Sequence, residues 1–199
     1  LCVDVIQSLG IIPMDVRECN IAFLAADAHK WLLGPEGIGI FFCREDLVQS
    51  LRPPLVGWKS VQNEFDFDHP VLQLKNNPHR FEEGSQNLLG IFGLGTAVEL
   101  LLEVGIENIK RRVLDLGDQI IEEARKRGLT ILTPLHREER GGIITITGSF
   151  DPATARDALR ERGIMVNVRG GGLRLSPHFY NTTEDINTLF QNLDSLYPQ

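Results

Sequence analysis

Two short apolar runs separated by a polar break constrain the fold of this chain more than any other feature. Residues 22–26 (AFLAA) and 38–42 (IGIFF) are apolar throughout, and residues 27–30 (DAHK) and the turn sequence 34–37 (GPEG) lie between them. Short apolar runs flanked by chain breakers are typical of strands that are buried on both faces of a sheet. The pattern predicts an α/β fold in which Lys30 lies just past a strand end, where α/β proteins bind ligands.

Lys30 is a candidate nucleophile. A lysine at the rim of a buried sheet is partly desolvated, which favours the neutral amine that attacks carbonyl groups. For an isolated His-Lys pair, a solvated lysine that simply ends a strand is the alternative. The rest of the sequence therefore has to decide between the two interpretations.

Composition narrows the class of protein. The chain has 199 residues, of which 42% are hydrophobic, so it can bury a sizeable core in one or two domains. A net charge of -7 argues against a nucleic-acid partner. The three cysteines form no CxxC pair and predict free thiols in a reducing cytoplasm, and the five histidines show no metal-binding spacing. No apolar run is long enough to suggest a membrane span.

The second half of the chain has the pattern of a separate, smaller unit. Gly105 separates two segments with helical spacing, and we place a domain boundary there, with residues 1–105 in one domain and 106–199 in a small C-terminal α/β domain. Residues 53–81 show no sustained period and predict a long loop, a candidate lid. The expected helices are 88–104, 106–127, 152–162 and 183–196, and the expected strands of the small domain are 129–132, 143–147, 164–168 and 173–176.

Four blocks of sequence, in order, resemble one enzyme family. They are VDVIQSLGIIPMDV (3–16), DAHKWLLGPEGIGIFF (27–42), RFEEGSQNLLGIFGLG (80–95) and LRLSPHFYNTTEDI (173–186). Together they look like the class V aminotransferase family, which comprises pyridoxal phosphate (PLP) enzymes of fold type I and includes cysteine desulfurases, kynureninase and isopenicillin epimerase-like proteins. The resemblance implies that this chain is the C-terminal part of a longer enzyme, because a complete member has a preceding segment that grips and stacks on the cofactor.

The resemblance also assigns roles to residues around the cofactor. Lys30 would form the lysine aldimine, Asp4 would pair with the pyridinium nitrogen, Gln7 would reach the phenolic oxygen and His29 the phosphate. A carboxylate at the ring nitrogen keeps it protonated, so the ring can draw electrons from the substrate. From the residues alone, Asp4 fits a turn or cap equally well, and His29 fits a rim histidine bonded to backbone. Asp27 departs from the desulfurase branch, where a serine is common, and a carboxylate there would repel phosphate.

Two further assignments concern the partner subunit and the substrate. By the resemblance, Gly84 and Ser85 reach the phosphate of the neighbouring subunit's cofactor, which implies a homodimer with shared active sites; an ordinary helix N-cap is the alternative. Arg174 alternates with Leu173 and Leu175 and would bind the substrate carboxylate through its guanidinium fork, unless it is a plain surface arginine.

The expected reaction is the conversion of an amino acid through the lysine aldimine, most of all transamination of the class V aminotransferase type. PLP-dependent elimination, epimerisation and desulfurase-like chemistry of the same family are the alternatives, and a non-catalytic fragment is another. Desulfurases carry a catalytic cysteine on a loop before the substrate arginine, and residues 163–174 contain none. Persulfide chemistry is therefore disfavoured, and the choice among the other reactions stays open.

Overall fold

The computed structural model describes residues 1–198 and divides the chain into two compact units. Unit 1 comprises residues 1–9 and 14–102, and unit 2 comprises residues 10–13 together with the chain from residue 103 onward. The short segment 10–13 thus groups with the second half of the chain, which the sequence did not indicate. The assignment of 1–105 and 106–199 as functional domains stays a prediction.

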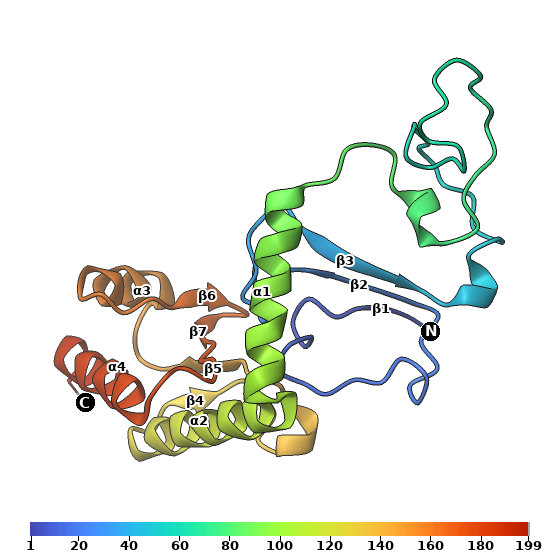
Figure 1. Ribbon diagram of the computed structural model, residues 1–199. Helices are drawn as coiled ribbons and strands as arrows, with labels where there is room; N and C mark the ends of the chain where they lie inside the picture. Colours follow the sequence, from blue (N-terminus) through green and yellow to red (C-terminus); the bar gives the residue numbers. More distant parts are fainter. Residues whose placement is uncertain (199) are drawn as a thin grey trace. The chain divides into compact units, whose positions relative to one another are not determined.

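Unit 1 is built on a three-stranded sheet. Its strands are β1 (Cys2–Asp4), β2 (Phe23–Asp27) and β3 (Gly39–Cys43). β1 pairs with β2 in parallel, and β2 pairs with β3 antiparallel (Figure 1). The two apolar runs therefore do form strands, as predicted.

The prediction that these strands are buried on both faces is wrong. Along β2, Leu24 and Ala26 are buried whereas Ala25 is exposed, so the strand is buried on one face. On β3, Phe41 is 49% exposed. The reason is that the apolar cluster around Leu24 packs against one face, while the other face carries aromatic rings, such as Phe23 and Phe41, that cover one another only partly.

The remainder of unit 1 is a loop followed by one long helix. The chain after β3 forms a single 3-10 turn, η1 (Glu45–Leu47), and a second such turn is η2 (Pro78–Phe81). Between them the chain makes one isolated bridge, Val61 with Leu74, so the predicted long loop is confirmed. The helix is α1 (Leu88–Val104).

α1 approaches the β2–β3 turn closely. A Cβ atom on Gly90 would lie 3.0 Å from the Ile38 Cβ, and one on Gly93 would lie 3.1 Å from the Pro35 Cγ. The Asn87 side chain caps the helix, since its Oδ1 accepts from the Gly90 N–H at 3.0 Å while its Nδ2 donates to the Gly37 carbonyl at 3.0 Å. Small residues and one asparagine thus fasten α1 to the turn that follows Lys30.

Unit 2 is an antiparallel sheet covered by three helices. The sheet has the order β4 (Thr130–Ile131), β5 (Ile144–Thr147), β7 (Gly172–Leu175) and β6 (Asn167–Arg169). The helices are α2 (Ile106–Lys126), α3 (Pro152–Glu161) and α4 (Thr183–Leu196) (Figure 1). Alternate strand residues such as Ile144 and Leu173 point into one apolar cluster with helix residues such as Leu159 and Phe190.

Local sequence signals account for the ends of these elements. Asp151 caps α3, where its Oδ1 accepts from the Thr154 N–H at 2.8 Å. Thr182 and Asp185 form a capping box at the start of α4. The β6–β7 hairpin turns at Gly170 and Gly171, whose φ angles of 59° and 81° favour glycine. All four predicted helices are confirmed, whereas the strand expected at 164–168 begins later, at Asn167.

No single helix among residues 1–198 is long and apolar enough to cross a membrane. The helices α1 and α2, which are broken at Gly105, pass that test of length and composition only when they are taken together.

Candidate active site

Lys30 lies in a tight turn directly after β2. The turn is closed by hydrogen bonds from the Leu33 N–H to the Lys30 carbonyl, at 3.0 Å, and from the Gly34 N–H to the Ala28 carbonyl, at 2.9 Å. Ala28 is fully buried, and a Cβ atom on Gly34 would lie 2.8 Å from the Ala28 Cβ. The turn therefore holds Lys30 in a fixed place, half-buried, and the ammonium nitrogen has no hydrogen bond or ion pair within residues 1–198.

Asp4 and Gln7 lie at the same edge of the sheet as Lys30. Asp4 ends β1, and because β1 and β2 are parallel, their carboxyl ends meet at one edge. The chain then turns, and the Asp4 Oδ1 accepts from the Ile6 N–H at 3.0 Å. This bond is a local turn contact of the kind that the alternative interpretation of Asp4 expected, but it leaves the Asp4 side chain exposed at the sheet edge.

Trp31 contacts Gln7, and the sequence did not single out this tryptophan. The Trp31 indole Nε1 donates a hydrogen bond to the Gln7 Oε1 at 3.1 Å, and Trp31 is 5% exposed. The sequence feature that could have pointed to Trp31 is its position directly after Lys30. A buried indole in that position must place its N–H group on a partner.

His29 lies beside Asp27. The His29 Nδ1 and the Asp27 Oδ2 are 4.0 Å apart, and both side chains reach solvent. A pair at this distance and exposure contributes little to stability. It does give the Asp27 carboxylate a cationic neighbour when His29 is protonated, which reduces the repulsion that Asp27 would exert on a bound phosphate.

Gly84 and Ser85 lie in the irregular segment before α1. A Cβ atom on Gly84 would meet nothing within 4 Å, and Ser85 is exposed. Because Asn87 caps α1, the alternative interpretation of Gly84 and Ser85 as the N-cap is wrong. The segment is preceded by the buried Arg80, whose Nη1 donates to the Gln49 Oε1 at 2.7 Å.

Arg174 belongs to unit 2 and lies on the central strand β7. Its neighbours Leu173 and Leu175 are buried in the core, so the alternation predicted for this strand is confirmed. Arg174 itself is half-buried, and its Nε is a buried donor with no hydrogen-bond partner within residues 1–198. Arg80 and Arg140 also bury guanidinium donors without a hydrogen-bond partner among these residues, so three arginines share this feature.

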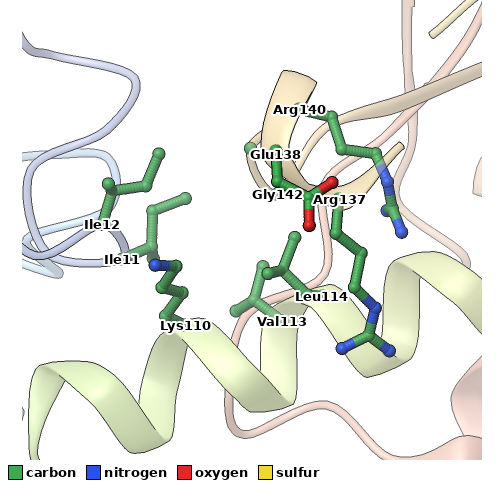
Figure 2. Close-up of a pocket in the computed structure, with 10 residues that line it drawn as sticks. Ile11, Ile12, Lys110, Val113, Leu114, Arg137, Glu138, Arg140 and Gly142 are labelled. Carbon is green, nitrogen blue, oxygen red and sulfur yellow. The ribbon is translucent and has the colours of Figure 1, made fainter. Parts of the chain in front are cut away.

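A cavity of about 150 Å³ in unit 2 contains none of the predicted residues (Figure 2). Arg140 lines it and is paired with Asp118, and Arg137 is paired with the same carboxylate. The Arg140 guanidinium lies over the middle of α2, where a Cβ atom on Gly117 would be 2.6 Å from the Arg140 Nη1. The arginines at this cavity therefore serve to fasten the loop to the helix.

Within residues 1–198, no group of three or more His, Cys, Asp or Glu side chains could hold a metal ion. All three cysteines are free thiols, and Cys43 is buried.

Comparison with known families gives one match that covers nearly the whole chain. The family model "Aminotransferase class-V" matches residues 1–189. The uncharacterized aminotransferase YcbU of Bacillus subtilis is 29% identical over 94% of this chain and 48% of the relative. A probable cysteine desulfurase of Pyrococcus abyssi is 26% identical over 98% of this chain and 51% of the relative.

Solved structures show the same fold. The apo cysteine desulfurase of Thermococcus onnurineus superposes with a TM-score of 0.89 at 25% identity, covering 98% of this chain and 52% of that one. The cystine C-S lyase C-DES, solved in complex with its product cysteine persulfide, has a TM-score of 0.85 at 21% identity, covering 94% and 50%. The chain spans about half the length of the relatives that it matches.

Proposed function

Since this chain belongs to the class V aminotransferase family, we propose that it forms part of a PLP-dependent enzyme that acts on an amino acid, with Lys30 as the residue that binds the cofactor aldehyde. The family resemblance of the four sequence blocks is confirmed by the match over residues 1–189, and the fold type I architecture by the Thermococcus onnurineus structure. The prediction of a PLP-dependent enzyme class is confirmed at the level of the family.

The observation that carries the proposal is the placement of Asp4, Gln7 and Lys30 at one edge of the sheet, where the parallel strands β1 and β2 end. When bound, PLP supplies an electron sink for the substrate's α-carbon. The Asp4 carboxylate would hold the proton on the ring nitrogen, the Gln7 amide would donate to the phenolic oxygen, and His29 would face the phosphate. The unpaired Lys30 amine would bind the cofactor and move the proton at the α-carbon.

Arg174 completes the proposal on the substrate side. A carboxylate accepts two parallel hydrogen bonds from a guanidinium fork, and Arg174 carries such a fork, half-buried, on the central strand β7. We assign Arg174 to the substrate carboxylate on this ground.

Transamination is the reaction that we propose for the whole enzyme. Desulfuration or C–S cleavage is the second candidate, because several relatives are named probable cysteine desulfurases. A protein thiol that accepts the sulfur is disfavoured, because residues 163–174 contain no cysteine. Burial also raises the pKa of the Cys43 thiol, which keeps that cysteine protonated and unreactive near neutral pH.

We further propose that the enzyme is a homodimer in which Gly84 and Ser85 reach the partner's cofactor. The large exposed side chains of α1 support an association, since Leu89 is 87% exposed and Phe92 is 74% exposed. A monomeric mass in sedimentation at micromolar concentration, with the cofactor present, would contradict this part of the proposal.

The first test of the proposal is the visible absorption of the chain after loading with PLP and desalting. The parent should retain an absorption band of covalently bound cofactor, and Lys30→Ala should lose it. Lys126→Ala, which removes an exposed lysine from α2, is the matched control and should keep the band. A parent without a band would mean that these 199 residues are a non-catalytic part of the enzyme.

The second test separates the two reactions. Transamination predicts that an amino donor bleaches the band and that a keto acid restores it, with no sulfide released from cysteine. Sulfide or persulfide release from cysteine, without dependence on a keto acid, would replace transamination by C–S cleavage.

A further inference from the structure

We infer that Trp31 is a positioning residue, which fixes the amide of Gln7 so that its Nε2, and not its Oε1, is presented to the cofactor's phenolic oxygen. This inference rests on the proposed function and adds to it a residue that no comparison assigns.

The hydrogen bond between the two side chains is the starting point. Trp31 Nε1 lies 3.1 Å from Gln7 Oε1, and the two residues are 24 positions apart in the chain. Trp31 is held by burial, with 5% of its surface exposed, whereas Gln7 is an exposed residue on the turn after β1. The buried Trp31 therefore orders the exposed side chain of Gln7.

The chemistry of the two groups sets the orientation of the amide. An indole N–H can only donate, so it requires the amide oxygen as its acceptor. A glutamine amide rotated by 180° would point its NH₂ group at the indole N–H and lose this bond. With Oε1 occupied, the Nε2 hydrogens remain, and Nε2 makes no hydrogen bond to any of the residues 1–198.

A phenolic oxygen that carries negative charge needs a donor. The orientation set by Trp31 presents such a donor, whereas the rotated amide would present oxygen lone pairs and repel the charge. Trp31 thereby determines whether Gln7 offers the cofactor a hydrogen-bond donor or an acceptor, and it does so without touching the cofactor.

The same bond also joins two parts of the site. Trp31 directly follows Lys30 in the turn after β2, and Gln7 lies in the turn after β1. One hydrogen bond thus ties the segment that carries the nucleophile to the segment that carries the ring contact.

The test begins without cofactor, on the full chain labelled with ¹⁵N. The indole N–H signal of Trp31 should move in Gln7→Met, which removes the acceptor at similar length, and should stay nearer its position in Gln7→Glu, which keeps an acceptor. The indole of Trp58, at 38% exposed, is the internal control and should not respond. A Trp31 signal that is unchanged in Gln7→Met would overturn the inference.

The second readout uses the chain loaded with PLP. Trp31→Phe keeps an aromatic ring in the buried site and removes the N–H group. We expect it to weaken PLP binding by about 5-fold, the loss of roughly one neutral hydrogen bond, and to move the pH midpoint of the visible band upward, as Gln7→Met does. The double variant should be no worse than Gln7→Met alone, because the two residues act through one contact.

Two outcomes distinguish the possible failures. If Trp31→Phe lowers stability but leaves the pH midpoint unchanged while Gln7→Met moves it, Trp31 is merely structural and the inference is wrong. If the parent holds no PLP, these residues alone do not bind the cofactor and the second readout falls away, whereas the indole signal still decides whether Trp31 orders the Gln7 amide.

Discussion

Unit 2 and unit 1 differ in how completely they bury their apolar side chains. In unit 2, four strands and three helices share one cluster in which Ile144, Ile146 and Phe190 are fully buried. In unit 1, the sheet that carries Lys30 packs on a small cluster around Leu24, while Phe92 of α1 stands 74% exposed. Since a fully buried large apolar side chain stabilises a fold by about 1.5–3 kcal/mol, most of the stability within the described residues should reside in unit 2.

The largest effect that tests this comparison is expected at Phe190. Phe190→Ala removes a fully buried ring from the unit 2 core and should lower the free energy of unfolding by about 3–5 kcal/mol, measured in urea. Phe92→Ala removes the same side chain from an exposed position in unit 1 and, at a concentration where the chain is monomeric, should change it by less than about 0.5 kcal/mol. Equal losses at the two positions would show that Phe92 is buried in solution and would break the comparison.

Native-state hydrogen exchange tests a smaller difference, in the local stability of one strand from each unit. The amides of β5 should open with a free energy at least about 1–2 kcal/mol higher than those of β2, a factor of roughly 5–30 in protection. The two strands have similar length, with Ile144–Thr147 and Phe23–Asp27, so the contrast reports on packing. Protection of β2 that equals that of β5 would mean that unit 1 is stabilised by contacts beyond its own small core.

The smallest effect is expected at Glu64, in the long loop of unit 1. Its carboxylate pairs with Lys75 and, at 3.0 Å, with Lys59, which lowers its pKa below the ordinary value of 4.5. Because the folded-state pKa is the lower one, the pair stabilises the fold above about pH 4.5, and this contribution is lost as the pH falls through the folded-state pKa.

Glu64→Gln checks that expectation in thermal melts between pH 3 and 7. The parent should exceed the variant slightly in melting temperature near neutral pH and lose the advantage toward pH 3. A constant difference across the range would show that Glu64 acts through packing and not through its charge.

Local patterns predicted most of unit 2. α2 and α4 each carry an apolar stripe at helical spacing. Thr182 marks the start of α4, and Gly170 and Gly171 mark the turn of the β6–β7 hairpin. These signals depend on neighbours within a few residues, which is why the sequence alone was sufficient.

The features that the sequence did not predict all depend on distant parts of the chain. The exposed face of β3 follows from what packs on the sheet and not from the composition of the strand. The bond from Trp31 to Gln7 and the bond from Asn87 to the Gly37 carbonyl join positions 24 and 50 residues apart. For the candidate site, the residue types were predictable from the family resemblance, whereas the contact that orients Gln7 was not.

The packing of Arg140 on Gly117 has a consequence for how this protein can change. A glycine inside a helix costs about 1 kcal/mol relative to alanine, so α2 gives up intrinsic stability where the guanidinium lies. A chimera that takes the loop of residues 136–142 from one protein and α2 from another would set a side chain against that guanidinium or leave the glycine without its partner. The helix α2 and the loop of residues 136–142 therefore have to change together, and a chimera should take both from the same protein.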